Sequence, residues 1–243
     1  MATEQKKGLN TNSNAYIIIY STILVVIVAF CLAFIFQALK DRQDANVALD
    51  KKKQVLASLN IRGLGDEESD QKYKEVILSD AIIDAQGNVT AQGAQGGEKD
   101  GFKLNSGDYK QGRLALYTAK VDGQTKYIVP VYGMGLWGSI WGYVALNEDC
   151  RTIYGAFFNH EGETAGLGAE IKDSQEWQDL FKGKQITNDK GDIVIAVKKA
   201  SEKPDPKCEV DAVTGATLTS VGVSDMLQES FGKYKAFLTK NAK

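Results

Sequence analysis

Residues 211–220, DAVTGATLTS, place four hydroxyl side chains around one glycine. From Val223 onward, apolar residues recur at helical spacing, so a final helix is expected with Thr219 or Ser220 as its N-cap. Thr217 would then lie just ahead of free backbone N–H groups. The N-terminus of a helix attracts negative charge, and phosphate above all. The stretch therefore indicates a phosphate-binding or phosphate-linked site.

A helix cap with no ligand is the alternative for this stretch. It accounts for one or two of the hydroxyls, but not for Asp211 and Gly215 together. Gly215 and Ala216 also leave little bulk beside Thr217, so a large group can reach its hydroxyl. From the residues alone, both interpretations stay open.

A second segment, residues 159–168, reads NHEGETAGLG. It combines titratable groups, a hydroxyl and three glycines between an expected strand and an expected helix. Glycine lets the backbone approach a flat ligand closely, and His160, Glu163 and Thr164 can bond to its polar edge. A turn with a surface histidine is the simpler alternative.

Residues 133–138, GMGLWG, match the G-x-G-x-x-G spacing of dinucleotide-binding folds. That fingerprint requires a strand before it and a helix after it. The residues that follow, SIWGYVAL, are typical of a strand instead. We therefore expect a glycine-rich turn that exposes Trp137 and Trp141, and no dinucleotide fold.

A run of 25 residues, 15–39, contains no Asp, Glu, Lys or Arg. About 20 apolar residues span a bilayer core, so this run predicts a transmembrane helix. A cleaved signal peptide has a shorter apolar region and ends at small residues, unlike Phe34 to Gln37 here. Lysines or arginines lie on both sides of the span, so the charge distribution does not set its orientation.

The rest of the chain predicts one α+β domain behind the anchor. The anchor is expected to continue as a stalk helix over residues 40–62, with Gly63 and Gly65 and an acidic turn ending it. Residues 73–83 form a segment of undecided type, and the glycine-rich residues 91–101 are expected to be a loop. Strands are predicted at 113–120, 126–131, 139–147, 152–158 and 192–198, with a hairpin turn at 121–124 and helices at 174–181 and from 218 onward.

Composition excludes several classes of function. The residues after 40 hold 26 basic and 30 acidic side chains, because 3 of the 29 basic and 1 of the 31 acidic residues come earlier. This mild acidity argues against nucleic acid binding. His160 is the sole histidine, so we expect no metal site. Cys150 and Cys208 are far apart, and the sequence does not decide whether they pair.

At residues 211–217, DAVTGAT, the chain resembles the flavinylation motif of the covalent FMN-binding domain family. Residues 160–168 are similar to a second segment of that family, near the isoalloxazine ring. Together with the single span and residues 135–143, GLWGSIWGY, the whole chain is similar to the C-type subunits of bacterial sodium-translocating NADH:quinone oxidoreductases.

The resemblance implies that Thr217 bears FMN through a phosphoester, attached by a separate periplasmic flavin transferase that uses FAD and magnesium. Asp211 and Gly215 would be recognition elements for that enzyme, and Leu167, Trp137 and Trp141 candidate apolar walls. No residue is expected to act as a catalytic acid, base or nucleophile. The expected cofactor-binding residues are Thr217, Asp211, Thr214, Gly215, Ala216, His160, Glu163, Thr164, Leu167, Gly168 and Trp137.

The resemblance also implies an organisation and a location. A cytoplasmic segment, 1–14, precedes the inner-membrane span 15–39 and the stalk 40–62, and residues 63–243 form a periplasmic FMN-binding domain with an antiparallel sheet and flanking helices. The chain would carry electrons within a multi-subunit respiratory complex that pumps sodium ions. A G-type subunit of an Rnf complex and a membrane-anchored adaptor without a cofactor are the alternatives.

Overall fold

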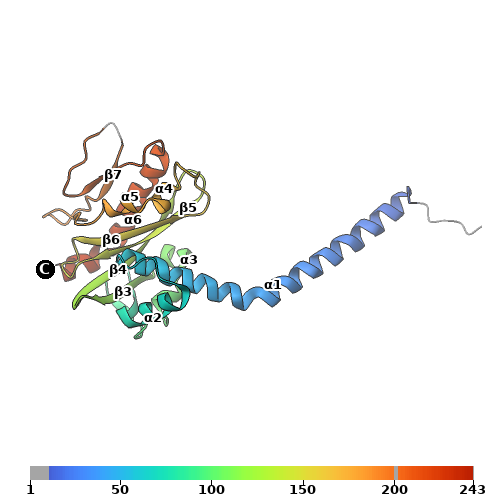
Figure 1. Cartoon of the computed structure of the whole chain (residues 1–243), viewed down its shortest axis with the longest axis horizontal. Helices are drawn as coiled ribbons and strands as arrows, with labels where there is room; N and C mark the ends of the chain where they lie inside the picture. Colours follow the sequence, from blue (N-terminus) through green and yellow to red (C-terminus); the bar gives the residue numbers. More distant parts are fainter. Residues whose placement is uncertain (1–10, 200–201, 243) are drawn as a thin grey trace, which may run out of the picture. The chain divides into compact units, whose positions relative to one another are not determined.

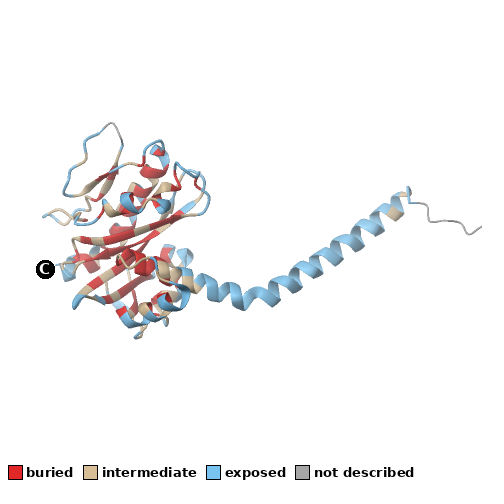
Figure 2. Ribbon diagram, in the orientation of Figure 1, coloured by how far each residue is buried: buried red, intermediate tan, exposed pale blue. Residues whose placement is uncertain are grey.

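The computed structural model describes residues 11–199 and 202–242, so most of the expected N-terminal segment 1–14 lies outside the described residues. One long helix, α1 (Asn14–Ser58), opens the described part (Figure 1). Its N-terminal portion is long and apolar enough to cross a membrane and buries none of its side chains (Figure 2). The predicted span thus lies within a continuous helix that also contains most of the predicted stalk.

The last turns of α1 belong to the folded domain, whose compact unit begins at Leu49. Val55, Leu56 and Leu59 are almost fully buried there. The helix ends at Ser58, and Asn60 follows with a φ of 62°, a left-handed conformation common after helix C-termini. The prediction that Gly63 and Gly65 end the helix was therefore wrong, because asparagine also tolerates this conformation.

A six-stranded antiparallel sheet forms the centre of the domain, with the strand order β2-β1-β3-β4-β5-β6. The turn between β3 and β4 contains Asp122 and Gly123 with φ angles of 50° and 79°, as a tight two-residue hairpin requires. The predicted hairpin is thus confirmed. The strands are β1 (Ile77–Ile83), β2 (Val89–Ala91), β3 (Leu114–Val121), β4 (Gln124–Met134), β5 (Ser139–Leu146) and β6 (Ile153–His160).

Helices cover both faces of the sheet. Figure 1 shows α2 on one side and α4 and α5 on the other. The long C-terminal helix α6 also packs on the sheet, mainly against β4. The helices are α2 (Asp66–Val76), η1 (Gly101–Lys103), α3 (Ser106–Lys110), α4 (Glu170–Asp173), α5 (Gln175–Asp179) and α6 (Thr217–Asn241), and a separate parallel pair is formed by β7 (Ala196–Lys198) and β8 (Glu209–Asp211).

The structure corrects two predicted segments and assigns one that the sequence left undecided. The acidic residues 66–68, expected as a turn, are the first turn of α2, where their charge complements the helix dipole. The segment of undecided type, 73–83, divides into the end of α2 and all of β1. Of the strand expected over 192–198, only Ala196–Lys198 pairs in a ladder, because its partner is the three-residue β8.

The alternation of side chains along the central strands produces two apolar cores. In β3, Leu114 and Leu116 point into the core shared with α4, α5 and α6. Their neighbours Ala115, Tyr117 and Ala119 point into the opposite core, which the end of α1 and α2 cover. The central strands therefore bury side chains on both faces of the sheet, as their red segments in Figure 2 show.

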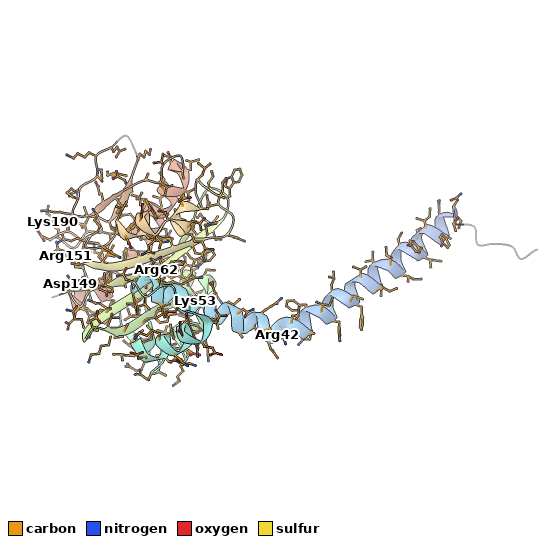
Figure 3. All side chains as sticks on the ribbon, in the orientation of Figure 1. Arg42, Lys53, Arg62, Asp149, Arg151 and Lys190 are labelled. Atoms are coloured by element: carbon orange, nitrogen blue, oxygen red, sulfur yellow. The ribbon has the colours of Figure 1, made fainter. Side chains whose placement is uncertain are left out.

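At one edge of the domain, Asp149, Arg151 and Lys190 lie near one another (Figure 3). The Arg151 guanidinium donates to the Thr187 carbonyl at 3.0 Å and forms an ion pair with Asp189 at 2.7 Å. The loop after β5 is thereby tied to residues 187–191.

The sequence left the pairing of Cys150 and Cys208 open, and the structure has no disulfide between them. Burial raises the pKa of the Cys208 thiol, and the nearby carboxylate of Asp205 adds to the shift. A raised pKa keeps the thiol protonated and poorly reactive near neutral pH.

The buried carboxylate of Asp80 in β1 organises a glycine-rich loop over residues 92–100. A loop was predicted over 91–101, and only its two outermost residues belong instead to β2 and η1. Its Oδ2 accepts from the N–H groups of Asp100 at 2.7 Å and Phe102 at 3.0 Å, and its Oδ1 accepts from the Ala94 N–H at 3.1 Å. A Cβ at Gly93 would come within 2.6 Å of the Asp80 backbone. The loop thus folds over this carboxylate without room for a side chain.

We predict that Asp80→Asn destabilises the domain, because one carboxylate oxygen becomes an amide donor that faces a backbone N–H. A buried unsatisfied donor costs about 1–3 kcal/mol. Each kcal/mol lowers the melting temperature of a domain of this size by about 2–4 °C. Asp84→Asn is the matched control, because the partly exposed Asp84 accepts from the N–H groups of Gln86 and Asn88 in a turn that asparagine also supports. Equal melting temperatures for the two variants would contradict the role given to Asp80.

Candidate functional site

Helix α6 begins at Thr217, with Ala216 as its N-cap residue. The first backbone bond of the helix runs from the Ser220 N–H to the Ala216 carbonyl at 2.9 Å. The prediction that Thr219 or Ser220 is the N-cap was therefore wrong, since the N-cap lies three or four residues earlier. Both hydroxyls are buried and bond elsewhere: Thr219 donates to Glu163, and Ser220 accepts from the Val213 N–H.

The first turn of α6 offers backbone N–H donors to an anion, and no acidic side chain of the turn repels that anion. Thr217, Leu218 and Thr219 precede the first helical hydrogen bond, and within the described residues their N–H groups have no backbone carbonyl partner. This turn, all of which is described, contains no acidic side chain. The Thr217 side chain is exposed. An anionic group on its hydroxyl would face the positive end of a 25-residue helix.

A tight turn leads into this helix end. The Ala216 N–H donates to the Val213 carbonyl at 3.1 Å, and Gly215 has a φ of 77°, which favours glycine. Ala216 is buried, whereas Thr214 and Gly215 are exposed. The turn therefore presents small side chains beside Thr217 and fixes the direction in which the helix leaves.

Asp211 lies at the end of β8 with its side chain exposed. Its carbonyl accepts a hydrogen bond from the buried indole N–H of Trp177 at 2.8 Å. Trp177 lies on α5, so this bond attaches the start of the 211–217 segment to the neighbouring helix. The sequence analysis placed Trp177 only on an apolar helix face and missed this hydrogen bond. The one available signal was the residue type, since the indole N–H of a buried tryptophan needs an acceptor.

The second predicted segment follows the end of β6. The Glu163 N–H donates to Nδ1 of His160 at 3.1 Å, which fixes a turn at the start of the loop. The N–H groups of Leu167 and Ala169 both donate to the Thr164 carbonyl, at 3.1 Å and 3.0 Å. The side chains of Thr164 and Leu167 are exposed, and Gly168 is buried. The loop thus turns its hydroxyl and its leucine outward.

Glu163 itself points inward and is 7% exposed. Its Oε1 accepts from the backbone N–H of Trp137 at 2.9 Å, and its Oε2 accepts from the Thr219 hydroxyl at 2.6 Å. Both oxygens are therefore bonded to protein groups rather than turned toward solvent. This carboxylate joins three segments that are distant in sequence: the β4–β5 turn, the loop after β6 and the first turn of α6.

Glycines allow these segments to approach closely. A Cβ at Gly135 would lie 2.3 Å from Glu163 Oε1, and one at Gly168 would lie 2.6 Å from the Thr219 hydroxyl. At Gly222 in α6, a Cβ would lie 2.3 Å from the Met134 carbonyl. Side chains at these positions would force the turn and the loop away from the helix.

The G-x-G-x-x-G stretch connects two antiparallel strands, so the expectation that it is no dinucleotide fingerprint is confirmed. Trp137 stands in this turn and is 68% exposed. Trp141 was expected to be exposed with it, which was wrong: it lies in β5, is half-buried, and its indole N–H donates to Gln54 at 2.9 Å.

Large apolar side chains are exposed on the three segments that Glu163 joins, one of which carries Thr217. A Cβ at Gly215 would lie 2.9 Å from Leu167, so the leucine lies directly against the turn before the helix. Exposed apolar side chains in such a concentration are typical of ligand or partner binding. The exposed apolar residues of the three segments are Met134, Leu136, Trp137, Leu167 and Leu218.

The structure thus brings most of the predicted site residues to one place. An exposed hydroxyl, free helix N–H groups and apolar side chains suit a molecule with a phosphate at one end and a flat ring at the other. Flavin mononucleotide has this construction. Asp211 and Thr214 are exposed on the same segment, and no described contact of their side chains sets a role for them.

Comparisons with known proteins agree with this geometry. The model of the FMN-binding domain family matches residues 135–231, a range that contains all three segments. A solved structure of the C subunit of the Na(+)-translocating NADH-quinone reductase from Parabacteroides distasonis is 37% identical, with a TM-score of 0.75, and covers 83% of this chain and 97% of its own. The Shewanella oneidensis NqrC structure is 27% identical, with a TM-score of 0.65, covering 79% and 95%.

Among sequences, the C subunit of the Na(+)-translocating NADH-quinone reductase of Pseudomonas aeruginosa is 31% identical, and the alignment covers 89% of this chain and 94% of the relative. The Haemophilus ducreyi protein of the same name is also 31% identical, over 87% and 88%. The relatives are named as subunits of an oxidoreductase complex. The chain therefore belongs to the family of C subunits of the Na(+)-translocating NADH-quinone reductases, and its soluble part contains an FMN-binding domain.

Proposed function

We propose that this chain carries electrons within a sodium-translocating NADH:quinone oxidoreductase by means of FMN joined through a phosphoester to Thr217. The observation that carries the proposal is the position of that hydroxyl. Thr217 is exposed at the first residue of α6, with free N–H groups beside it and a buried Ala216 before it. Thr219 and Ser220 are buried, so neither of these neighbouring hydroxyls competes for attachment.

The helix end would hold the phosphate of the cofactor. A phosphodiester keeps one negative charge, which the N–H groups of Thr217, Leu218 and Thr219 would receive. The absence of an acidic side chain from this fully described first turn avoids repulsion. Covalent attachment also prevents loss of the cofactor, which non-covalent contacts on so exposed a surface would hold only weakly.

The apolar side chains would hold the ring. Leu167 and Leu218 flank the attachment point, and Trp137 presents an exposed aromatic face from the β4–β5 turn. Flavin supplies the redox chemistry, accepting and passing on electrons, while the protein supplies position and polarity. No side chain has to transfer a proton or form a bond during turnover.

Family membership favours this function over the two alternatives. A cofactor-free adaptor does not account for an FMN-binding domain over residues 135–231. A subunit of an Rnf complex is less consistent with relatives that are named as C subunits of the NADH-quinone reductase and that match along 94% and 88% of their lengths. The partners we propose are the other subunits of that complex and a flavin transferase that modifies Thr217.

We also propose that the domain lies in the periplasm, behind the single inner-membrane span within α1, with the N-terminal segment in the cytoplasm. The span is supported by the length and apolar composition of this helix, which suffice to cross a membrane. A covalently held cofactor also suits a compartment from which lost FMN is not readily replaced.

For attachment, we predict that the chain, produced together with a flavin transferase, gains the mass of one FMN less water. Thr217→Val should abolish the gain, and Thr217→Ser should keep it, because only the hydroxyl is needed. In-gel flavin fluorescence after denaturation gives a second reading of the same event.

Thr239→Val is the matched control, because it removes an exposed hydroxyl at the far end of the same helix and should leave the attached mass in place. An unmodified parent chain, or modification that survives Thr217→Val, would refute attachment at this residue.

For orientation, we predict that a cysteine placed at exposed Lys110 reacts with a membrane-impermeant maleimide in intact spheroplasts. A cysteine at exposed Thr11, before the span, should react only after permeabilisation. The parent chain, with its three native cysteines, sets the background. The opposite pattern of labelling would place the domain in the cytoplasm.

A further inference from the structure

We propose that Glu163 is the positioning residue of the flavin site, and that it acts as a clasp between the ring-binding turn and the phosphate-bearing helix without touching the flavin. The proposal rests on the function proposed above for Thr217 and Trp137. It assigns to Glu163 a task different from hydrogen bonding to the flavin edge, which the sequence suggested.

The contacts of Glu163 show what it joins. One carboxylate oxygen accepts from the Trp137 N–H at 2.9 Å, and the other accepts from the Thr219 hydroxyl at 2.6 Å. Thr219 is two residues beyond Thr217 on the same helical turn. A single side chain thus connects the backbone of the aromatic wall with the helix turn that carries the attachment site.

The connection is specific because few other contacts could replace it. Trp137 is 68% exposed, so packing of its ring does not hold the turn in place. The turn itself is short, with one backbone hydrogen bond from the Gly135 N–H to the Gly138 carbonyl at 2.8 Å. Bonds to a buried charged acceptor are stronger than neutral ones, so this carboxylate dominates the position of the turn.

The surroundings are shaped to admit Glu163. Gly135 and Gly168 stand where a Cβ would come within 2.3 Å and 2.4 Å of its carboxylate oxygens. Its backbone N–H is also fixed, by donation to His160 Nδ1 at 3.1 Å. Both the carboxylate and the backbone N–H of Glu163 are therefore engaged in hydrogen bonds within the protein.

The nearby Glu161 provides a control with the same charge in the same loop. It is exposed, and its side chain accepts only a long hydrogen bond of 3.4 Å from the Ser139 N–H within the described part of the chain. Glu161→Ala therefore removes one negative charge near the turn without removing a buried connection.

The experiment uses the full chain in detergent with ¹⁵N-labelled tryptophan, which gives one backbone amide signal for each of three tryptophans. In flavin-free protein, Glu163→Ala should shift the Trp137 amide upfield and speed its hydrogen exchange about tenfold or more, as expected for loss of one strong hydrogen bond. The amides of Trp141 and Trp177 should stay unchanged. Glu161→Ala should leave all three amides near their parent values.

In flavin-loaded protein, Glu163→Ala should keep the mass gain at Thr217 but lower the fluorescence anisotropy of the bound flavin, because the wall is no longer fixed to the helix. Glu163→Gln should restore both readings in large part, since its amide can accept from Trp137 and donate to a rotated Thr219 hydroxyl. Thr219→Val should reproduce part of the loss, and Thr219→Ser should not.

The results distinguish a failure of the role proposed for Glu163 from a failure of the function proposed for Thr217. If Glu163→Ala and Glu161→Ala give the same amide and anisotropy values as the parent chain, the clasp is overturned. If Glu163→Ala does not fold, the Gln variant and the Thr219 pair decide by the same readings. If the parent chain gains no flavin, the function proposed for Thr217 fails, while the Trp137 amide still tests the clasp.

Discussion

The site depends on the placement of one helix end. Thr217 can present its hydroxyl beside free N–H groups only if α6 begins at that residue and leaves the preceding turn in a fixed direction. Three hydrogen bonds fix the start and direction of the helix. The Trp177 indole N–H donates to the Asp211 carbonyl, and the Ser220 hydroxyl accepts from the Val213 N–H. The Thr219 hydroxyl donates to the Glu163 carboxylate. Beyond this point α6 is held by the sheet, on which it packs along β4.

The architecture of the domain follows from the same requirement. The β4–β5 turn, the end of β6 and the start of α6 must meet at one end of the sheet, and antiparallel pairing of β4, β5 and β6 brings the first two together. Apolar side chains on the facing side of these strands bury the inner surface of α6. Binding groups can then lie on loops while the rigid sheet and helix fix their positions.

Sequence patterns predicted the parts of the fold that local physics determines. The apolar run 15–39, the Asp122-Gly123 hairpin and the helical spacing from Val223 onward each follow from periodicity or turn chemistry. The patterns failed in two places. The end of α1 at Ser58 was assigned to the later glycines, although Asn60 already adopts the left-handed conformation. The buried state of Glu163 depends on long-range contacts and has no local signal. The N-cap was also misplaced, since Thr219 and Ser220 have cap-forming side chains that tertiary bonds use instead.

Attachment of FMN to Thr217 is the central claim, and peptide mass spectrometry of the chain isolated from its native membrane tests it most directly. We expect the peptide containing residues 211–220 to carry FMN, with fragment ions that place the added mass on Thr217. A peptide found only in its unmodified form, or a flavin located on Thr214, Thr219 or Ser220, would contradict this claim.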